Sequence, residues 1–496
     1  MPENTDIALY TAEQVRELDR RAITLHGIPG YELMGRAGAA LAQQVNSGWP
    51  DADEVCILCG PGNNGGDGYV LARLLMQAGR GVRLLAVAGR DRLQGDARRA
   101  ADDYCTAGGN IEGYAGELPA TAALLVDALL GTGLDRAVTG DYREAIERMN
   151  RHPAPTLAVD IPSGLHADSG QELDAAVVAH TTVTFIGRKR GLYTGSGVRC
   201  AGRVIFDDLA VPAQIYADCD PAVWLMDRPA LGPLASPRPA DAHKGAFGHV
   251  LVVGGAPGMS GAARLAAEAA ARCGAGLVSV ATHPAHAAGL NSGRPELMVH
   301  PVASVDQLAK LLARATVVAV GPGLGQGSWS RGLFEQVLDS GLPLVVDADA
   351  LNLLARDPLK RNNWVLTPHP GEAARLLHSS AAAVQQDRFA AVRELQARYA
   401  GVAVLKGAGS LVAAAEAPPR LCGLGNPGMA SGGMGDVLSG AIAALCAQGL
   451  PLFDAARSGV WLHARAADRQ AAQYGERGLL AADLIPVMRR LLNGSR

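Results

Sequence analysis

A string of glycines followed by an aspartate stands near the carboxyl end of the chain, in the segment NPGMASGGMGDVLSGAIAAL at 426–445. Gly432, Gly433 and Gly435 lead into a predicted helix that has Asp436 in its first turn. Glycine amides and the positive end of a helix dipole can hold a phosphoryl group in transfer, and a carboxylate beside them can accept a proton from a hydroxyl. Asp436 could instead only cap the helix, a role worth about 1 kcal/mol. Capping leaves the glycines unexplained, so we favour phosphoryl-transfer chemistry.

A second Gly-rich segment, GPGNNGGDG at 60–68, follows the apolar run VCILC. We expect a strand to end before it and a helix to begin near Tyr69, which places the loop at the carboxyl end of a strand. Five glycines in nine residues allow backbone amides to turn toward a phosphate. A simple tight turn would use glycine too, but it would not need the polar Asn63, Asn64 and Asp67. The segment therefore predicts an anion-binding loop.

Two further aspartates close apolar runs, in VDALLGTGL at 126–134 and AVDIPSGLHADSG at 158–170. Carboxyl ends of parallel strands meet at one edge of a sheet, so Asp127 and Asp160 should both point into the crevice above the sheet. A single aspartate of this kind is often only a turn former or a helix cap. Two of them beside an Asn-rich loop predict a site that binds a hard cation or moves a proton.

The elements that position these residues follow from the alternation of short apolar runs with amphipathic stretches, which indicates parallel sheets covered by helices. A helix with Thr11 as its N-cap is expected first, at 12–25. In the first half, strands are predicted at 55–59, 82–88, 123–127, 156–161 and 181–186. In the second half, they are predicted near 249–254, 276–281, 316–320, 343–347, 364–367 and 402–406.

A linker is predicted between Asp218 and Lys244, where the alternation breaks into a stretch with prolines at 221, 229, 233, 237 and 239. We therefore expect two domains, at 1–220 and 225–496, each with its own α/β core. The length of 496 residues is compatible with two large domains. The halves share no motif beyond GPG, so they are predicted to be unlike domains rather than a duplication.

Charge and composition exclude several function classes. The net charge is −3 with no long basic run, so the chain lacks the electrostatic footprint of a nucleic-acid-binding protein. The start, MPENTDIALYTAEQ, has no apolar signal segment, and we expect a cytoplasmic protein. The apolar stretch 261–278 carries Arg264, Glu268 and Arg272 at spacing four, which predicts a core helix and not a membrane span.

Eight cysteines are scattered along the chain, too sparsely for a disulfide scaffold, which fits a reducing compartment. Cys56 and Cys59 form a CxxC, but their odd spacing in a strand places them on opposite faces. Without a second Cys pair we favour strand packing over metal binding.

The order GPGNNGGDG, VDALLGTGL, VDIPSGL resembles the NAD(P)H-hydrate epimerase family over about residues 8–215, with a Rossmann-like doubly wound sheet. This resemblance implies that the substrate is bound by Asn63, Asn64, Gly65, Gly66, Asp67, Gly131, Thr132, Gly133, Leu134, Asp135, Arg136, Ala137 and Asp160, the first five at its phosphate. It also implies a potassium ion (K+) held by Asn64, Asp127 and Ser163. Asp160 is the residue we expect to be catalytic.

In the second half, the G-x-G-D arrangement is similar to the ribokinase-like α/β sandwich, in which an aspartate acts as base. Together with GPGLG, DADALN, TPHPGE and KGAGS, residues 225–496 resemble the ADP-dependent NAD(P)H-hydrate dehydratases. The resemblance implies that the hydrate is contacted by Ala263, Gly323, His369 and Asp436. It assigns the adenine nucleotide to Lys406, Gly407, Ala408, Gly409, Ser410 and Gly435.

The resemblance implies a repair reaction. Water adds to the dihydronicotinamide ring and leaves a hydroxyl at C6 in two epimeric forms. Phosphoryl transfer from ADP to that hydroxyl would make it a good leaving group, with AMP and phosphate as products and Mg²⁺ (Mg2+) screening charge. A dehydratase that accepts only the S epimer needs an epimerase for the R form, which explains the fusion. We expect small-molecule substrates, a homo-oligomer, and neither nucleic acid nor membrane as partners.

Two alternatives remain open from the residues alone. The first is a ribokinase-like small-molecule kinase with an unrelated nucleotide-binding N-terminal domain, because the anion loop and Asp436 would serve a kinase equally well. The second is a non-catalytic nucleotide-binding module that regulates a partner. TPHPGE together with GPGNNGGDG weighs against the kinase, and the presence of both Asp160 and Asp436 weighs against the regulatory module.

Overall fold

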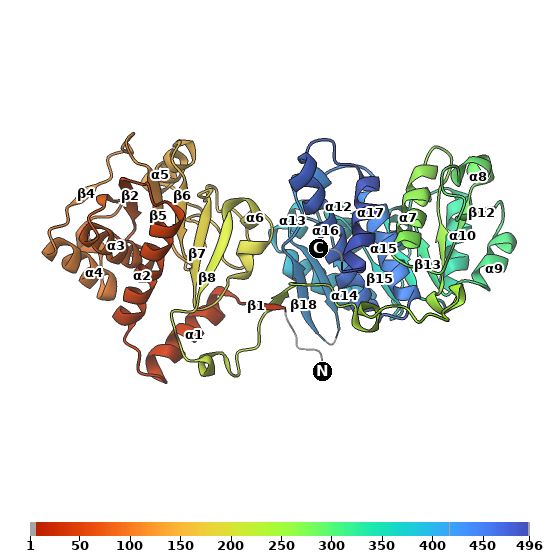
Figure 1. Ribbon diagram of the computed structural model, residues 1–496, viewed down its shortest axis with the longest axis horizontal. Coiled ribbons are helices and arrows are strands. Elements are labelled where there is room, and N and C mark those ends of the chain that lie inside the picture. Colours follow the sequence, from red (N-terminus) through yellow and green to blue (C-terminus); the bar gives the residue numbers. More distant parts are fainter. Residues whose placement is uncertain (1–5, 416, 495–496) are drawn as a thin grey trace. The chain divides into compact units, whose positions relative to one another are not determined.

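The structure is a computed structural model that describes residues 6–415 and 417–494. Its contacts divide the chain into two compact units. One consists of residues 8–223, and the other contains residues 224–494 together with Asp6 and Ile7 at the start of the chain. Each unit has a sheet of its own, of seven and of eleven strands (Figure 1). The fold is α/β with two unlike sheets, as predicted.

The seven-stranded sheet is wholly parallel and has the order β4-β3-β2-β5-β6-β7-β8. This is the Rossmann-like doubly wound order, and its direction reverses between β2 and β5, where ligands bind above the carboxyl ends. Its strands are β2 Glu54–Cys59, β3 Gly81–Ala86, β4 Ile111–Gly113, β5 Leu124–Ala128, β6 Thr156–Val159, β7 Thr181–Phe185 and β8 Arg203–Asp207.

Helices cover both faces of this sheet. Residues of α1 Ala12–Thr24, α2 Gly30–Gly48, α3 Asn63–Gln77 and α4 Gly95–Thr106 share one core cluster, whereas α5 Gly140–Arg151 packs in the cluster on the opposite face. A short α6 spans Gly197–Cys200. Cys59 lies in the first cluster and Cys56 in the second, which confirms their placement on opposite faces. Thr11 caps α1 with a reciprocal capping box to Gln14, as expected from the sequence.

The eleven-stranded sheet has the order β1-β9-β18-β17-β16-β15-β14-β13-β10-β11-β12. It is mixed, because β17 runs antiparallel to both β16 and β18. Its direction reverses between β10 and β13. The strands are β1 Ile7–Leu9, β9 Val223–Leu225, β10 His249–Val253, β11 Leu277–Thr282, β12 Met298–Pro301, β13 Val317–Val320, β14 Leu344–Val346, β15 Trp364–Leu366, β16 Val402–Leu405, β17 Ser410–Ala414 and β18 Ala417–Cys422.

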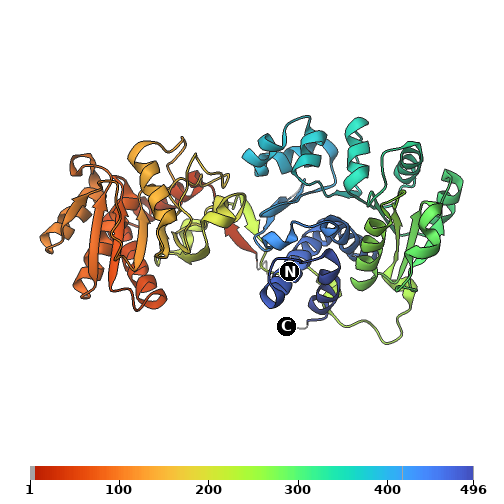
Figure 2. The same ribbon diagram turned by 90° about the horizontal axis from the view of Figure 1, so that it is seen from above.

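One face of this sheet is covered by α7 Ser260–Arg272, α15 Met434–Ala447, α16 Leu452–Tyr474 and α17 Ala481–Leu492, whose alanines and leucines form its largest core cluster (Figure 2). Small side chains on α7 and α15 let the two helices approach closely: a Cβ on Gly440 would lie 2.0 Å from the Ala266 carbonyl oxygen. The remaining helices are α8 Pro284–Leu290, α9 Val305–Leu312, α10 Ser328–Asp339, α11 Ala348–Arg356, α12 Pro370–Leu377, α13 Ala381–Gln386 and α14 Arg388–Tyr399.

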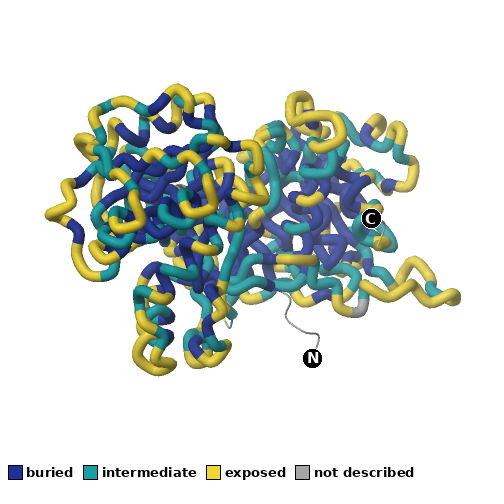
Figure 3. The backbone as a smooth tube through the Cα atoms, turned by 60° about the vertical axis from the view of Figure 1, so that its left-hand side comes forward, coloured by how far each residue is buried: buried dark blue, intermediate teal, exposed yellow. Residues whose placement is uncertain are grey.

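Buried residues concentrate in the strands and in the helix faces turned toward them, while the loops and outer helix faces are exposed (Figure 3). The segment predicted as an apolar core helix, 261–278, contains α7 and the first residues of β11. No helix among the described residues is long and apolar enough to cross a membrane.

Candidate active sites

A cavity of about 660 Å³ opens above the carboxyl ends of β2, β5 and β6 in the N-terminal unit. This is the reversal point of the sheet, where the sequence placed a site. Most of the predicted substrate contacts line it, namely Asn63, Asn64, Asp67, Gly131, Thr132, Gly133, Leu134, Asp135, Arg136 and Asp160. Gly65, Gly66 and Ala137 are not among the lining residues.

The helix after β2 begins at Asn63 and not near Tyr69, so the predicted start was wrong by six residues. The glycines indicate a loop from the sequence, but here they lie within the helix and allow it to pack closely against its neighbours. A Cβ on Gly65 would lie 2.0 Å from the Gly60 carbonyl oxygen, and one on Gly68 would lie 2.7 Å from the Cys59 Sγ atom. The first-turn amides of α3 still border the cavity at Asn63 and Asn64, where they can hold an anion.

Asp160 follows β6 and has a left-handed backbone with φ 62°. Its Oδ1 atom accepts hydrogen bonds from the Phe185 amide at 3.1 Å, from Thr184 Oγ1 at 3.2 Å and from the Lys189 ammonium. Lys189 is 1% exposed, and its Nζ atom also donates to Thr184 Oγ1 and to the Phe185 carbonyl, each at 3.1 Å. The ammonium therefore has three protein acceptors. Asp160 itself lines the cavity, and its Oδ2 atom has no hydrogen-bond partner among the described residues.

Two more carboxyl groups, Asp19 of α1 and Asp67 of α3, line the same cavity. Burial raises the pKa of Asp19 to about 6, with Asp160 adding to the shift and Lys189 opposing it. Burial and the carboxylates of Asp160 and Asp19 raise the pKa of Asp67 well above its usual range. Neither carboxyl has a hydrogen bond or ion pair within the part of the chain that the structure describes. Burial therefore favours the protonated form of Asp67, which can donate a hydrogen bond.

The three residues expected at a potassium ion lie together beneath the cavity. Asp127 is fully buried and accepts from Ser163 Oγ at 2.5 Å and from the Ser163 amide at 2.7 Å. Asn64 reaches the Leu130 carbonyl oxygen at 3.2 Å, and Ser163 Oγ lies at the same distance from that oxygen. A carbonyl, an amide, a hydroxyl and a carboxylate are the hard oxygen donors that such a cation prefers. The donor set fits potassium when the side-chain amide of Asn64 is rotated so that its oxygen, and not its nitrogen, faces the Leu130 carbonyl oxygen.

In the C-terminal unit, α15 begins at Met434 after the left-handed Gly433, which is its N-cap residue with φ 88°. Asp436 is the third residue of the helix, so it is not the N-cap that the simpler interpretation proposed. Burial and the neighbouring Asp347 raise the pKa of Asp436 to about 7, and Lys406 opposes this shift. The helix terminus thus combines free amides with a carboxyl group that is poised to exchange a proton near neutrality.

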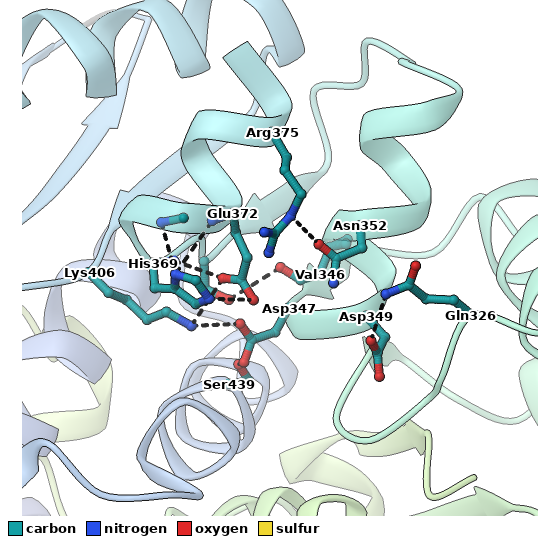
Figure 4. Close-up of polar contacts among 12 residues, drawn as sticks. Gln326, Val346, Asp347, Asp349, Asn352, His369, Glu372, Arg375, Lys406 and Ser439 are labelled. Atoms are coloured by element: carbon teal, nitrogen blue, oxygen red, sulfur yellow. Dashed lines mark hydrogen bonds and ion pairs between the residues drawn. The ribbon is translucent and has the colours of Figure 1, made fainter. Parts of the chain in front are cut away.

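A buried ion pair lies directly beside this helix terminus (Figure 4). Lys406, at the end of β16, donates to Asp347 Oδ1 at 2.8 Å, and Ser439 of α15 donates to Asp347 Oδ2 at 2.7 Å. Glu372 Oε2 lies 3.8 Å from Lys406 Nζ. A Cβ on Gly435 would lie 3.1 Å from Lys406 Nζ, so glycine at this point lets the ammonium lie close to the backbone without crowding. Lys406 is 19% exposed on its side chain and can meet an anion.

His369 is the N-cap of α12, which agrees with its predicted position at a strand end rather than on a helix face. Its Nδ1 atom accepts from the Gly371 amide at 3.0 Å, and Glu372 Oε2 accepts from the His369 amide at 2.8 Å. Burial and the charge of Lys406 lower the pKa of His369. The ring is therefore neutral, half-exposed and able to donate a hydrogen bond from Nε2.

The predicted nucleotide loop, residues 406–410, joins β16 to β17. Beneath it lies Arg388 of α14, which is 1% exposed and donates to the carbonyl oxygens of Leu405, Lys406 and Gly409 at 3.2 to 3.4 Å. A buried guanidinium that bonds three loop carbonyls fixes the course of the loop. Gly407 and Ala408 are exposed at its tip.

Gly323 and Ala263 lie at the reversal point between β10 and β13. Gly323 has a left-handed φ of 57°, and a Cβ there would lie 2.5 Å from the Met259 carbonyl oxygen. Ala263 is 0% exposed and packs against Gly255. Its methyl group offers no surface to a ligand in this structure, because the close approach of α7 to the glycine loop covers it.

Several residues of these sites were not singled out from the sequence. Lys189 stands in the charged run GRKRGL, which follows a predicted strand. Nothing within this run distinguishes Lys189 from its arginine neighbours. Asp19 stands four residues after the buried Val15 on an amphipathic helix, and that spacing was the available signal. Asp347, Glu372 and Arg388 were also missed as individual residues, although the first two belong to motifs that were noticed.

All eight cysteines are free. No group of three or more His, Cys, Asp or Glu side chains that could hold a metal ion occurs within residues 6–415 and 417–494. Potassium at a single carboxylate with neutral oxygens, and magnesium at phosphate oxygens, do not require such a group.

Two family models match successive parts of the chain. The model described as YjeF-related protein N-terminus matches residues 30–191, and the model described as NAD(P)H-hydrate dehydratase matches residues 250–490. The chain is 48% identical to the bifunctional NAD(P)H-hydrate repair enzyme Nnr of Coxiella burnetii, over 98% of this chain and 99% of that one. It is 45% identical to the enzyme of the same name from Escherichia coli, over 99% and 95% of the two chains.

Among solved structures, a ribokinase-like superfamily protein from Enterococcus faecalis superposes with a TM-score of 0.50 at 27% identity, covering 55% of this chain and 96% of that one. The ribokinase-like architecture of the C-terminal sheet is thereby confirmed.

Proposed function

Because the chain belongs to the bifunctional NAD(P)H-hydrate repair enzymes, which epimerise and dehydrate hydrated NADH and NADPH, we propose that each α/β unit houses one of these activities. The epimerase is assigned to residues 8–223 and the dehydratase to residues 224–496. The division is supported by the separate cavity and helix-terminus sites of the two units. The kinase alternative loses its basis, since full-length relatives of the same name cover both halves.

For the dehydratase, we propose that Asp436 is the general base. It accepts the proton of the C6 hydroxyl of the S hydrate while the hydroxyl oxygen takes a phosphoryl group from ADP, which leaves as AMP. Phosphate then departs with the electron pair of the C6–O bond, a proton is lost from C5, and the ring double bond returns. The observation that carries this proposal is the position of Asp436, with its pKa near 7, beside the free amides that begin α15.

The surroundings of Asp436 have matching roles. The Lys406 ammonium, held by Asp347, neutralises charge that develops on the phosphoryl group. The 406–410 loop and Gly435 bind the nucleotide, and the neutral His369 ring donates a hydrogen bond to the hydrate. Mg²⁺ would be held chiefly by phosphate oxygens, because it keeps waters and needs only one or two carboxylates. Ala263 is proposed to shape the substrate loop and not to touch the hydrate.

For the epimerase, we propose that the hydrate lies in the cavity above β2, β5 and β6, with its phosphate at the start of α3 and its ring near Asp160. Asn64, Asp127, Ser163 and the Leu130 carbonyl would hold a potassium ion beneath it, which supplies a fixed positive charge under the substrate. The cavity size and the convergence of ten predicted residues on its wall support this assignment.

The proposed function is tested by incubating the protein with mixed hydrate epimers and either ADP or ATP, and by following the return of the dihydronicotinamide absorbance. We expect complete recovery with ADP, and recovery of the S fraction alone when the epimerase is inactivated. Recovery without any nucleotide would contradict the phosphoryl-transfer mechanism. We also propose that the protein is located in the cytoplasm, which suits its eight free cysteines. A homo-oligomeric state is proposed as well, and light scattering can check it.

A further inference from the structure

The epimerase cavity contains more acid–base groups than the proposed binding of the hydrate uses. Asp160 lines the cavity and is bound to Lys189 through Oδ1, while its Oδ2 atom has no hydrogen-bond partner among the described residues. Asp19, from a helix that the sequence did not connect with the site, lines the same wall and lacks a partner among the described residues. A carboxyl group without a partner is costly to place in a partly buried cavity. The position of Asp19 therefore points to a ligand that completes its hydrogen bonds.

Inversion at C6 of the hydrate needs one base and one acid acting together. C6 carries both the hydroxyl and the ring nitrogen N1. When a base removes the hydroxyl proton, C6 becomes a carbonyl carbon, the C6–N1 bond breaks with its electron pair on N1, and an acid protonates N1. After rotation about C5–C6, N1 attacks the other face of the carbonyl. Both protons then return to the groups they came from, so no oxidant, reductant or co-reactant is consumed.

We propose that Asp19 is a further catalytic residue of the epimerase, the general acid that protonates N1 while the Asp160 carboxylate, positioned by Lys189, accepts the proton of the C6 hydroxyl. This proposal rests on the epimerase activity proposed for this cavity. Lys189 is a positioning residue, since its three hydrogen bonds all go to the protein.

The environments of the carboxyl groups support this division of roles. An acid is most effective when its pKa lies near the working pH, and burial raises the pKa of Asp19 to about 6. Burial and the neighbouring Asp160 and Asp19 also raise the pKa of Asp67 well above its usual range, which favours its protonated, hydrogen-bond-donating form. The other charged groups on the cavity wall are Arg16, Asp96, Asp135, Arg136 and Lys189, and Lys189 faces Asp160 and Asp19.

The test uses the full-length protein with the purified R hydrate of NADH and no nucleotide, and chromatography to follow formation of the S hydrate. Asp19→Asn should slow the interconversion by a factor of about 10² to 10⁴. Repair of the pure S hydrate with ADP should be unchanged. The wild-type rate should fall as the pH rises above about 6, and Asp19→Asn should lack this limb while Asp19→Glu retains it.

Asp168→Asn is the matched control, because Asp168 Oδ1 accepts from the Ala12 amide at 2.7 Å and so holds the start of the helix that carries Asp19. It should epimerise within a fewfold of the wild-type rate. The thermal midpoint of Asp19→Asn should not fall, since the change removes a carboxyl that burial disfavours.

An Asp19→Asn enzyme with wild-type epimerisation would overturn the assignment, as would an equal loss in Asp168→Asn. If the wild-type protein repaired the S hydrate but never interconverted the epimers, the proposed epimerase activity of this cavity would be wrong, and so would the role of Asp19.

Discussion

Both units place a lysine–aspartate ion pair beside a carboxyl group of raised pKa, but they arrange it in opposite ways. In the N-terminal unit Lys189 is enclosed and all its hydrogen bonds go to the protein. In the C-terminal unit Lys406 is partly open and lies against the glycine that begins a helix. The first arrangement orients a carboxylate for proton transfer within a substrate whose charge does not change. The second leaves a cation available to an incoming phosphoryl group.

The largest effect expected from this difference is that of Asp436→Asn. Because the base acts in the transition state, turnover of the S hydrate should fall by about two to four orders of magnitude while nucleotide binding survives. Gly433, and not Asp436, occupies the N-cap position, so replacing the Asp436 carboxylate by an asparagine side chain should not weaken α15. Epimerisation should be unaffected. Near-normal repair by the variant would show that Asp436 is not the base.

Asp127→Ala should act on the other unit alone. The change removes a fully buried carboxylate that orders Ser163 and the Leu129 amide, and we expect epimerisation to slow about 10- to 100-fold, as for the loss of a cation-supporting group. Ser163→Ala is the milder companion variant. Assays with pure S and pure R hydrate separate the two activities. Equal loss of S-hydrate repair would contradict the independence of the two sites.

The pH dependence of the two activities should run in opposite directions in one protein. The pKa of Asp19 is raised to about 6 and that of Asp436 to about 7. Asp19 acts as an acid, so epimerisation should fall about tenfold for each pH unit above 6. Asp436 acts as a base and must be ionised, so dehydration should rise with pH until about 7 and then level. Rates measured from pH 5 to 9 check this, and parallel profiles would contradict it.

The smallest effect is on stability and involves no active-site group. Asp6 lies between Arg420 and Arg457, with Oδ2 at 3.0 and 3.4 Å from them. Asp6→Ala should lower the unfolding free energy of the C-terminal unit by about 3 kcal/mol, because both partly buried arginines lose their carboxylate. Scanning calorimetry should show that only the transition raised by ADP moves. A shift in the other transition would mean that the unit assignment of Asp6 is wrong.

The regular part of this fold could be predicted from the sequence because apolar runs such as VCILC and VVAV carry their own signal. The predicted strands lie within two residues of the observed ones at their N-terminal ends. Seven strands were missed: β1, β4, β8, β9, β12, β17 and β18. The segment APPRLC, which forms β18, contains two prolines and an arginine, features that normally exclude a central strand. Tertiary pairing overrides them.

Site residues could be predicted where a motif follows a strand. They could not be predicted where a single charged side chain outside these motifs reaches the site. GPGNNGGDG follows the carboxyl end of β2 and SGGMGD leads into α15, as their glycines suggested. The burial of Lys189 and Arg388 could not be foreseen, since their partners are backbone carbonyls and residues on other strands. The start of α3 was missed because glycine was taken as a loop signal, whereas here it permits close packing inside a helix. The domain boundaries 1–220 and 225–496 remain predictions, although Asp6 and Ile7 pack with the C-terminal unit.

β1 belongs to a sheet whose other strands are synthesised much later than β1 itself. Asp6 and its partner Arg420 are 414 residues apart, so at about 5 to 20 residues per second a ribosome needs roughly 20 to 80 s to deliver the second after the first. The N-terminal unit can complete its sheet during this time, while β1, and β9 once it has been made, still lack β18 and the rest of their sheet. An unpaired edge strand invites aggregation unless it is short or charged. β1 has only three residues and directly follows Asp6, so the nascent chain carries its last piece of sheet in a form that tolerates the delay.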